Sequence, residues 1–290
     1  MTSGTCGAAA GRGTLRPMLN IILALHVAGG SLALASMLVP MVTRKGGTAH
    51  RRAGWLFVGG MTDVSVTAFV LAGARVLTDP SPNGRTAGIF LFFVSILTAA
   101  GVSAGVRVLR AKRRSAPHRH PWDVGIAGAL VLASVAMAIW GLSTGRALFT
   151  AFSAIGLFTG GTQLAYWLRT PTHRMHWWFQ HMSAMLGSCI AATTAFLVVN
   201  AGRFGLGTFA LAVWLSPAVI GVPAIAIWTA YYRRRFQRTE TTTSYPPAGV
   251  NDELSEASAP VTVRRVASCR SARVSVESAV DVSRERASGL

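Results

Sequence analysis

Apolar residues occur along this chain in long runs, and not in the short alternating pattern of a soluble domain. A bilayer core of roughly 30 Å requires about 20 apolar residues in helical form, because the backbone must satisfy its own hydrogen bonds there. Seven runs meet this requirement, at residues 18–42, 54–77, 87–109, 123–143, 147–168, 176–199 and 205–231. None carries a basic residue near its centre. The pattern predicts an all-α, polytopic transmembrane bundle of about seven helices. Three similar His-Arg sequences that precede tryptophans, at His50, His118 and His173, suggest a helical hairpin repeated three times.

The remaining chain predicts two parts outside the bundle. Residues 1–17 form a short external N-terminus, and residues 18–238 form the transmembrane helical domain. Residues 239–290 are rich in Ser, Thr, Ala, Val and Arg, and no aromatic residue follows Tyr245. Such a segment buries too little apolar surface to offset its ordering entropy, so we expect a disordered cytoplasmic tail, which could bind a protein partner.

The first run has a rival interpretation as a signal peptide. Arg12 and Arg16 precede an apolar stretch that passes through the small residues Ala35 and Ser36, as at a cleavage site. The run continues to Val42 and is long enough to span a bilayer, which favours a retained helix. Cleavage would leave six helices with the same inner loops.

Positive charge divides the loops into two groups. The chain has 28 Lys and Arg against 10 Asp and Glu, for a net charge of +18. Sixteen basic residues lie at or just after the ends of the first, third, fifth and seventh apolar runs, whereas six lie on the opposite side of the predicted bundle. Because Lys and Arg accumulate in short cytoplasmic loops, the N-terminus is expected outside and the C-terminus inside. Charge dispersed in this way favours anionic lipid at the cytoplasmic face over nucleic acid as the partner.

Three His-Arg boxes precede tryptophans at the predicted inner boundary. They begin at His50, His118 and His173. A basic residue beside a tryptophan is typical of a lipid-interface anchor, since the charge contacts phosphate and the ring lies at headgroup level. The predicted anchors are Arg51, Trp55, Arg119, Trp122, Arg174 and Trp177. The box histidines could instead contact haem propionates, quinone head groups or metals.

Ionisable groups inside the membrane are the best indicators of function, because they carry a desolvation cost. His26 in the first run and Asp63 in the second lie at similar depth. They are predicted to form either a proton relay or cation site, a haem ligand with its orienting carboxylate, or a buried polar clasp. A second predicted pairing joins Gln163 with His181.

Histidines also suggest a cofactor. The candidate cofactor-binding residues are His26, His173, His176, His181 and Gln163. His181 is rotated by about 140° from His176 on a helix, which disfavours a three-histidine zinc site, and no metal is predicted. The scattered Cys6, Cys189 and Cys269 form neither a CxxC nor a CxxCH motif, so covalently bound c-type haem is not supported.

These residues resemble a group of predicted bacterial multi-pass membrane proteins of unknown function. The shared features are a histidine followed by Gly in the first helix, an Arg-Lys-Gly loop, a His-Arg-x-x-Gly helix entry and a later histidine-rich helix. Here they correspond to His26 with Gly29, Arg44-Lys45-Gly46, His50 to Gly54, and His181 to Gly187 running on to Thr194-Ala-Phe196. The resemblance covers about half of the chain and implies a bacterial cytoplasmic membrane, but it supplies no substrate.

Three classes of function remain open. The first is a redox membrane protein that binds haem b or a quinone through intramembrane histidines. The second is a proton-coupled small-molecule transporter that uses His26 and Asp63. The third is a non-catalytic scaffold or assembly factor, which could be a homo-oligomer. The sequence has no HExxH motif, phosphate-binding glycine loop or nucleophile–base arrangement, so an ordinary hydrolase or kinase is disfavoured and the question of an enzyme stays open.

Overall fold

The fold is a bundle of long helices in a computed structural model that describes residues 6–206 and 211–243. The helices are α1 (Cys6–Val42), α2 (Thr48–Thr78), α3 (Pro82–Arg107), α4 (Pro121–Ser143), α5 (Ala147–Leu168), α6 (His176–Asn200) and α7 (Leu211–Thr243), with 3-10 turns η1 (Val108–Arg110) and η2 (Ala201–Phe204). Seven of them are long and apolar enough to cross a membrane, and no strand occurs in the described ranges. The predicted all-α transmembrane bundle is confirmed. The predicted tail, 239–290, lies almost entirely outside the described residues.

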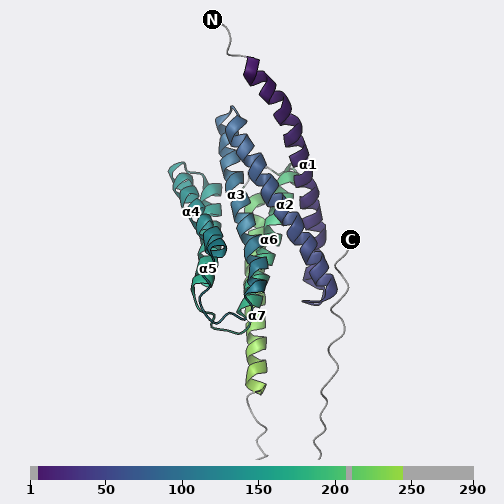
Figure 1. The fold of residues 1–290 in the computed structure, drawn as a ribbon, viewed down its shortest axis with the longest axis vertical. Coiled ribbons are helices and arrows are strands. Elements are labelled where there is room, and N and C mark those ends of the chain that lie inside the picture. The colour runs from purple at the N-terminus through teal and green to yellow at the C-terminus, as the bar shows by residue number, and fades with distance from the viewer. Residues whose placement is uncertain (1–5, 207–210, 244–290) are drawn as a thin grey trace, which may run out of the picture. The chain divides into compact units, whose positions relative to one another are not determined.

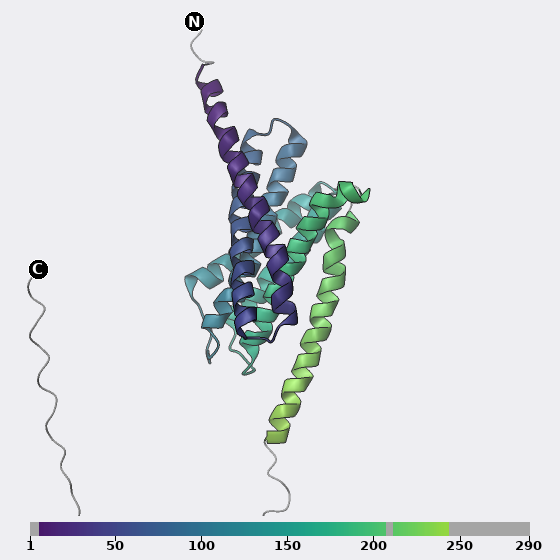
Figure 2. The same ribbon diagram turned by 90° about the vertical axis from the view of Figure 1, so that its right-hand side faces the viewer.

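Helices α3 and α6 lie at the centre of the bundle (Figure 1). The α1–α2 hairpin packs on one side of them and the α4–α5 hairpin on the other. Helix α6 packs on α3 and α1, so it does not form a third hairpin of the same kind. Figure 2 shows α7 running alongside this group at its edge. The loops that join α1 to α2, α3 to α4 and α5 to α6 lie at one end, which we call the basic end.

Local sequence explains where several helices begin. Ser81 caps α3, because its hydroxyl accepts a hydrogen bond from the Gly84 N–H at 3.0 Å, and Pro82 follows at the first helical position. His120 caps α4 in the same way through the Trp122 N–H. Helix α2 begins at Thr48, six residues before the predicted run, since hydropathy marks the apolar part of a helix and not its polar first turns.

Two apolar cores hold the helices together. The first is aromatic and joins α3, α5 and α7: the Phe90 ring lies 5.0 Å from Phe149, 5.2 Å from Phe152 and 5.2 Å from Trp214, centroid to centroid. The second core lies between α1, α2, α3 and α6 and is built from Ala33, Phe57, Met61, Val102 and Ala192, with Met185 packed against it. Side chains from α1, α2, α3 and α6 therefore meet in the second core.

Candidate functional site

His181 on α6 is held by the backbone of a neighbouring helix. Its Nδ1 lies 2.7 Å from the carbonyl oxygen of Gly105, one of the last four residues of α3. A carbonyl can only accept, so Nδ1 carries the proton and Nε2 of the neutral ring keeps a free lone pair. Helices α3 and α6 pass close together here, since a Cβ at Gly105 would lie 3.3 Å from Cβ of Ala184 and 2.1 Å from Cε at the flexible end of Met185.

His50 on α2 is held in the same manner. Its Nδ1 lies 3.2 Å from the carbonyl oxygen of Pro40, within the last turn of α1. The same oxygen accepts a hydrogen bond from Nζ of Lys45 at 2.7 Å. Partial burial lowers the pKa of Lys45 from its ordinary value. As in His181, the carbonyl partner requires that Nδ1 donates and leaves Nε2 of the neutral ring free.

His50 and His181, which we call the histidine pair, lie at the same end of one four-helix group. His50 precedes Phe57 by seven residues and His181 precedes Met185 by four, spacings that place each histidine on the face of its helix that builds the second core. The pair therefore continues the α1–α2–α3–α6 core toward the basic end.

The first half of α6 is neither sealed in the core nor turned to the outside. Every residue from 175 to 186 is half-buried, and none of them is buried or exposed. Among the described side chains, only Asp63 Oδ2 and Arg114 Nε are enclosed atoms without a hydrogen-bond partner. The Nε2 atom of His181 is not one of these two atoms.

The third embedded histidine, His26 on α1, bonds to α2 farther from the basic end. Its Nδ1 lies 2.9 Å from Oγ1 of Thr67, and that hydroxyl donates to the Asp63 carbonyl at 2.6 Å. Because the only hydroxyl proton is already used, Nδ1 of His26 must be the donor. The predicted direct pair of His26 with Asp63 is not formed among the described contacts. Asp63 instead faces Gly29, where a Cβ would lie 2.1 Å from Oδ2.

Depth separates His26 from the histidine pair. His26 lies 16 residues before the end of α1 at Val42, or about 24 Å along the axis. His181 lies five residues after the start of α6, or about 8 Å. A difference of about 16 Å is too large for these two rings to ligate one iron.

A second polar cluster lies where α3 ends and α4 begins. Asp123, whose side chain is 3 % exposed, accepts from Arg107 Nη2 at 2.9 Å, and Arg107 Nε makes a second contact. His118 Nε2 lies 3.1 Å from the same carboxylate, and His120 Nδ1 lies 4.0 Å from it. Asp123 is not among the site residues predicted from the sequence. The available signal was an isolated acidic residue in the first turn of a helix, directly after a strongly basic loop.

The other predicted site residues are separated from one another. His176 Nδ1 lies 2.8 Å from the Tyr166 hydroxyl, and His173 is exposed at the loop. Gln163 lines a small cavity beside Asp123, so the predicted pairing of Gln163 with His181 is not formed. No group of three or more His, Cys, Asp or Glu side chains within the described residues is placed to hold a metal ion.

The predicted lipid anchors lie at the basic end. Trp55 is 64 % and Trp122 is 60 % exposed, as expected for rings that contact lipid. The Trp177 ring is half-buried beneath Nζ of Lys112, which lies 4.7 Å from the ring centroid. Arg51, Arg119 and Arg174 are all exposed. Contact with anionic lipid remains a prediction from this placement.

No family model, curated protein or solved structure matches this chain. What the described residues establish is a polytopic protein with seven helices that could cross a membrane. Among the described residues, four imidazoles are each bonded through Nδ1 to a neighbouring helix: His26, His50, His176 and His181.

Proposed function

We propose that this protein is a membrane redox protein that binds haem b or a quinone at the histidine pair. The observation that carries the proposal is the bond from Nδ1 of His181 to Gly105, matched by that from His50 to Pro40. Histidines that ligate metals commonly donate their other ring nitrogen to a backbone carbonyl, which fixes the tautomer and the direction of the free nitrogen. The same free nitrogen can accept a hydrogen bond from a hydroquinone hydroxyl.

The surroundings of the pair support this proposal. The aromatic residues Trp178 and Phe179 lie within one turn of His181, and apolar side chains of the second core lie next to the pair. Lys45 and Lys112 supply positive charge nearby, suited to haem propionates or a reduced quinone. His181 would hold the group, with His50 as second ligand or hydrogen-bond partner. The bound group would supply one-electron transfer at iron, or two-electron transfer in a quinone.

The absorption spectrum of the full chain purified from haem-replete cells tests the proposal. We expect a Soret band, or a quinone in the organic extract. His181→Asn should remove it, because the Asn amide nitrogen can still donate to Gly105 while the position of Nε2 is lost. His173→Asn is the matched control, since His173 is exposed in a loop and should be dispensable.

Two results would contradict the redox proposal. One is a colourless preparation that also contains no quinone. The other is a chromophore or quinone that is retained in full by the His50→Asn/His181→Asn double variant.

A second function, proton-coupled transport, is favoured by one specific observation. Oδ2 of Asp63 is enclosed without a hydrogen-bond partner, at a point well inside a membrane-length helix. Unpaired carboxylates in such positions commonly belong to proton or cation pathways. Asp63→Asn should then lower proton flux in proteoliposomes at least tenfold, while Asp79→Asn, in the loop after α2, should leave it unchanged. Equal flux in the two variants would exclude this role for Asp63.

A further inference from the structure

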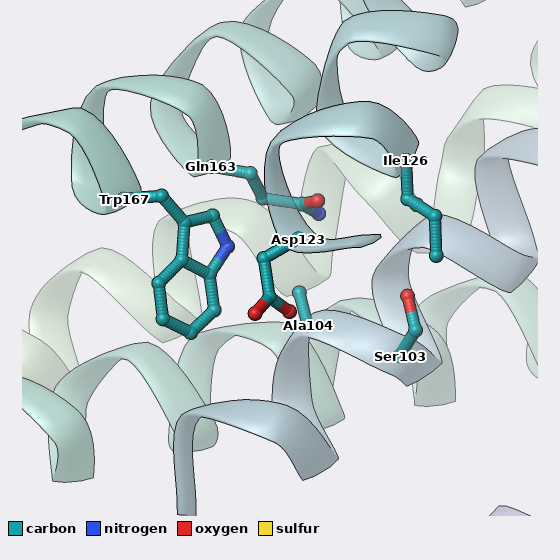
Figure 3. Close-up of a pocket in the computed structure, with 6 residues that line it drawn as sticks. All are labelled: Ser103, Ala104, Asp123, Ile126, Gln163 and Trp167. Atoms are coloured by element: carbon teal, nitrogen blue, oxygen red, sulfur yellow. The ribbon is translucent and has the colours of Figure 1, made fainter. Parts of the chain in front are cut away.

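A small cavity lies between α3, α4 and α5 near the basic end (Figure 3). Its volume is about 10 Å³, and it is lined by Ser103, Ala104, Asp123, Ile126, Gln163 and Trp167. A space of this size is at the lower limit for one water molecule. The volume alone does not decide whether the cavity holds a water molecule. The hydrogen-bonding groups that line it do.

Two of the lining side chains are deeply buried and have unused hydrogen-bonding atoms. Gln163 is 4 % exposed, and its amide makes no hydrogen bond within the described part of the chain. Trp167 is 2 % exposed; its carbonyl oxygen accepts from the His118 N–H at 2.9 Å, but its indole N–H has no partner there. Neither group is among the atoms sealed by protein, because both border the cavity. In Figure 3 the Trp167 indole nitrogen is turned toward Asp123, whereas the Gln163 amide extends past Asp123 on the side of Ile126.

The charge of the site selects a neutral occupant. The Asp123 carboxylate is already compensated by Arg107 and contacts His118, so a cation has no unpaired charge to meet. An empty space would leave the Gln163 amide and the Trp167 N–H without partners, which is rare for deeply buried polar groups. A neutral molecule about the size of one oxygen atom that both donates and accepts hydrogen bonds adds no charge to the site. It also gives the Gln163 amide and the Trp167 N–H a partner.

We propose that one water molecule is bound in this cavity and joins α3, α4 and α5. The water accepts from the Trp167 indole or the Gln163 amide nitrogen, and it donates to the Asp123 carboxylate and the Gln163 amide oxygen. These partners match the two to four hydrogen bonds that buried waters make. Gln163 is thereby assigned as a water-binding residue. This assignment does not depend on the proposed redox function.

Radiolytic footprinting in oxygen-18 water, on the full chain in lipid nanodiscs, tests this inference, because hydroxyl radicals formed from a bound water label the side chains beside it. We expect oxygen-18 on Trp167 at a rate several-fold above that on Trp214. Trp214 is the matched control, since it is similarly buried, at 7 % exposed, but packs against the rings of Phe90 and Phe152. Equal labelling of the two tryptophans would overturn the proposal.

A variant identifies the residue that holds the water. Gln163→Met keeps the length of the side chain but removes its hydrogen-bonding atoms. Labelling of Trp167 should fall to the rate of Trp214 in this variant, and unchanged labelling would refute the assignment of Gln163. If the variant does not fold, the comparison of Trp167 with Trp214 in the unaltered chain still decides whether the cavity holds water.

Discussion

Replacing Arg107 by methionine is expected to lower the free energy of unfolding by about 3–5 kcal/mol, the range for removing one partner of a buried ion pair. The reason is the position of Asp123, whose side chain is 3 % exposed and whose carboxylate receives two contacts from the Arg107 guanidinium. Without Arg107, the carboxylate would remain buried with only His118 as a strong donor. Equilibrium unfolding of the purified protein in detergent micelles measures the change.

Two further variants separate the ion pair from general damage. Arg107→Met/Asp123→Leu removes both charges and should recover most of the loss, since apolar replacement of a complete buried pair is often neutral. Arg75→Met is the surface control: Arg75 is 50 % exposed, its Nε lies 3.5 Å from Oδ2 of Asp79, and its loss should change stability by less than about 1 kcal/mol. An Arg107→Met protein as stable as the Arg75→Met protein would contradict this account of Asp123.

Gly60→Ala is the second substitution with a large expected effect. A Cβ at Gly60 would lie 2.6 Å from the carbonyl oxygen of Gly29 and 3.0 Å from the backbone nitrogen of Ala33. Backbone atoms cannot turn aside as a flexible side chain can, so α1 and α2 would have to separate. We expect a loss of about 2–3 kcal/mol in the free energy of unfolding, the cost typical of overpacking.

The neighbouring glycine provides the control for this prediction. A Cβ at Gly59 would meet nothing within 4 Å. Gly59→Ala should therefore be neutral or stabilise the helix by up to about 1 kcal/mol, because alanine has the higher helix propensity. Similar stability of the two alanine variants would show that α1 and α2 do not depend on this close approach.

Packing decided which of the candidate polar residues meet. His26 and Asp63 have similar depths when counted along their helices. In the structure, however, each of them faces a residue about one helical turn away from the other. His26 therefore bonds to Thr67, while Asp63 faces Gly29. Likewise, Gln163 and His181 lie at similar depth on consecutive helices, but α6 packs on α3 and α1 while Gln163 borders α3 and α4. Depth can be counted along a helix, whereas rotation and choice of neighbour cannot.

By itself, the sequence determined the elements: seven apolar helices, the ends of the first six to within two residues, and the gathering of basic and aromatic residues at one side of the bundle. These follow from the length of apolar runs and from loop charge, which are local properties. The seventh helix, Leu211–Thr243, begins and ends later than the predicted run 205–231. Only the tertiary structure decided the partners. His50 bonds to a carbonyl near the end of α1 and His181 to one near the end of α3, because α2 lies beside α1 and α6 lies beside α3. Asp123 became the centre of a buried cluster because Arg107, sixteen residues earlier, folds back onto it. Such contacts depend on helix rotation and neighbour choice, which are set by side-chain packing across the whole bundle and leave no periodic signal in the chain.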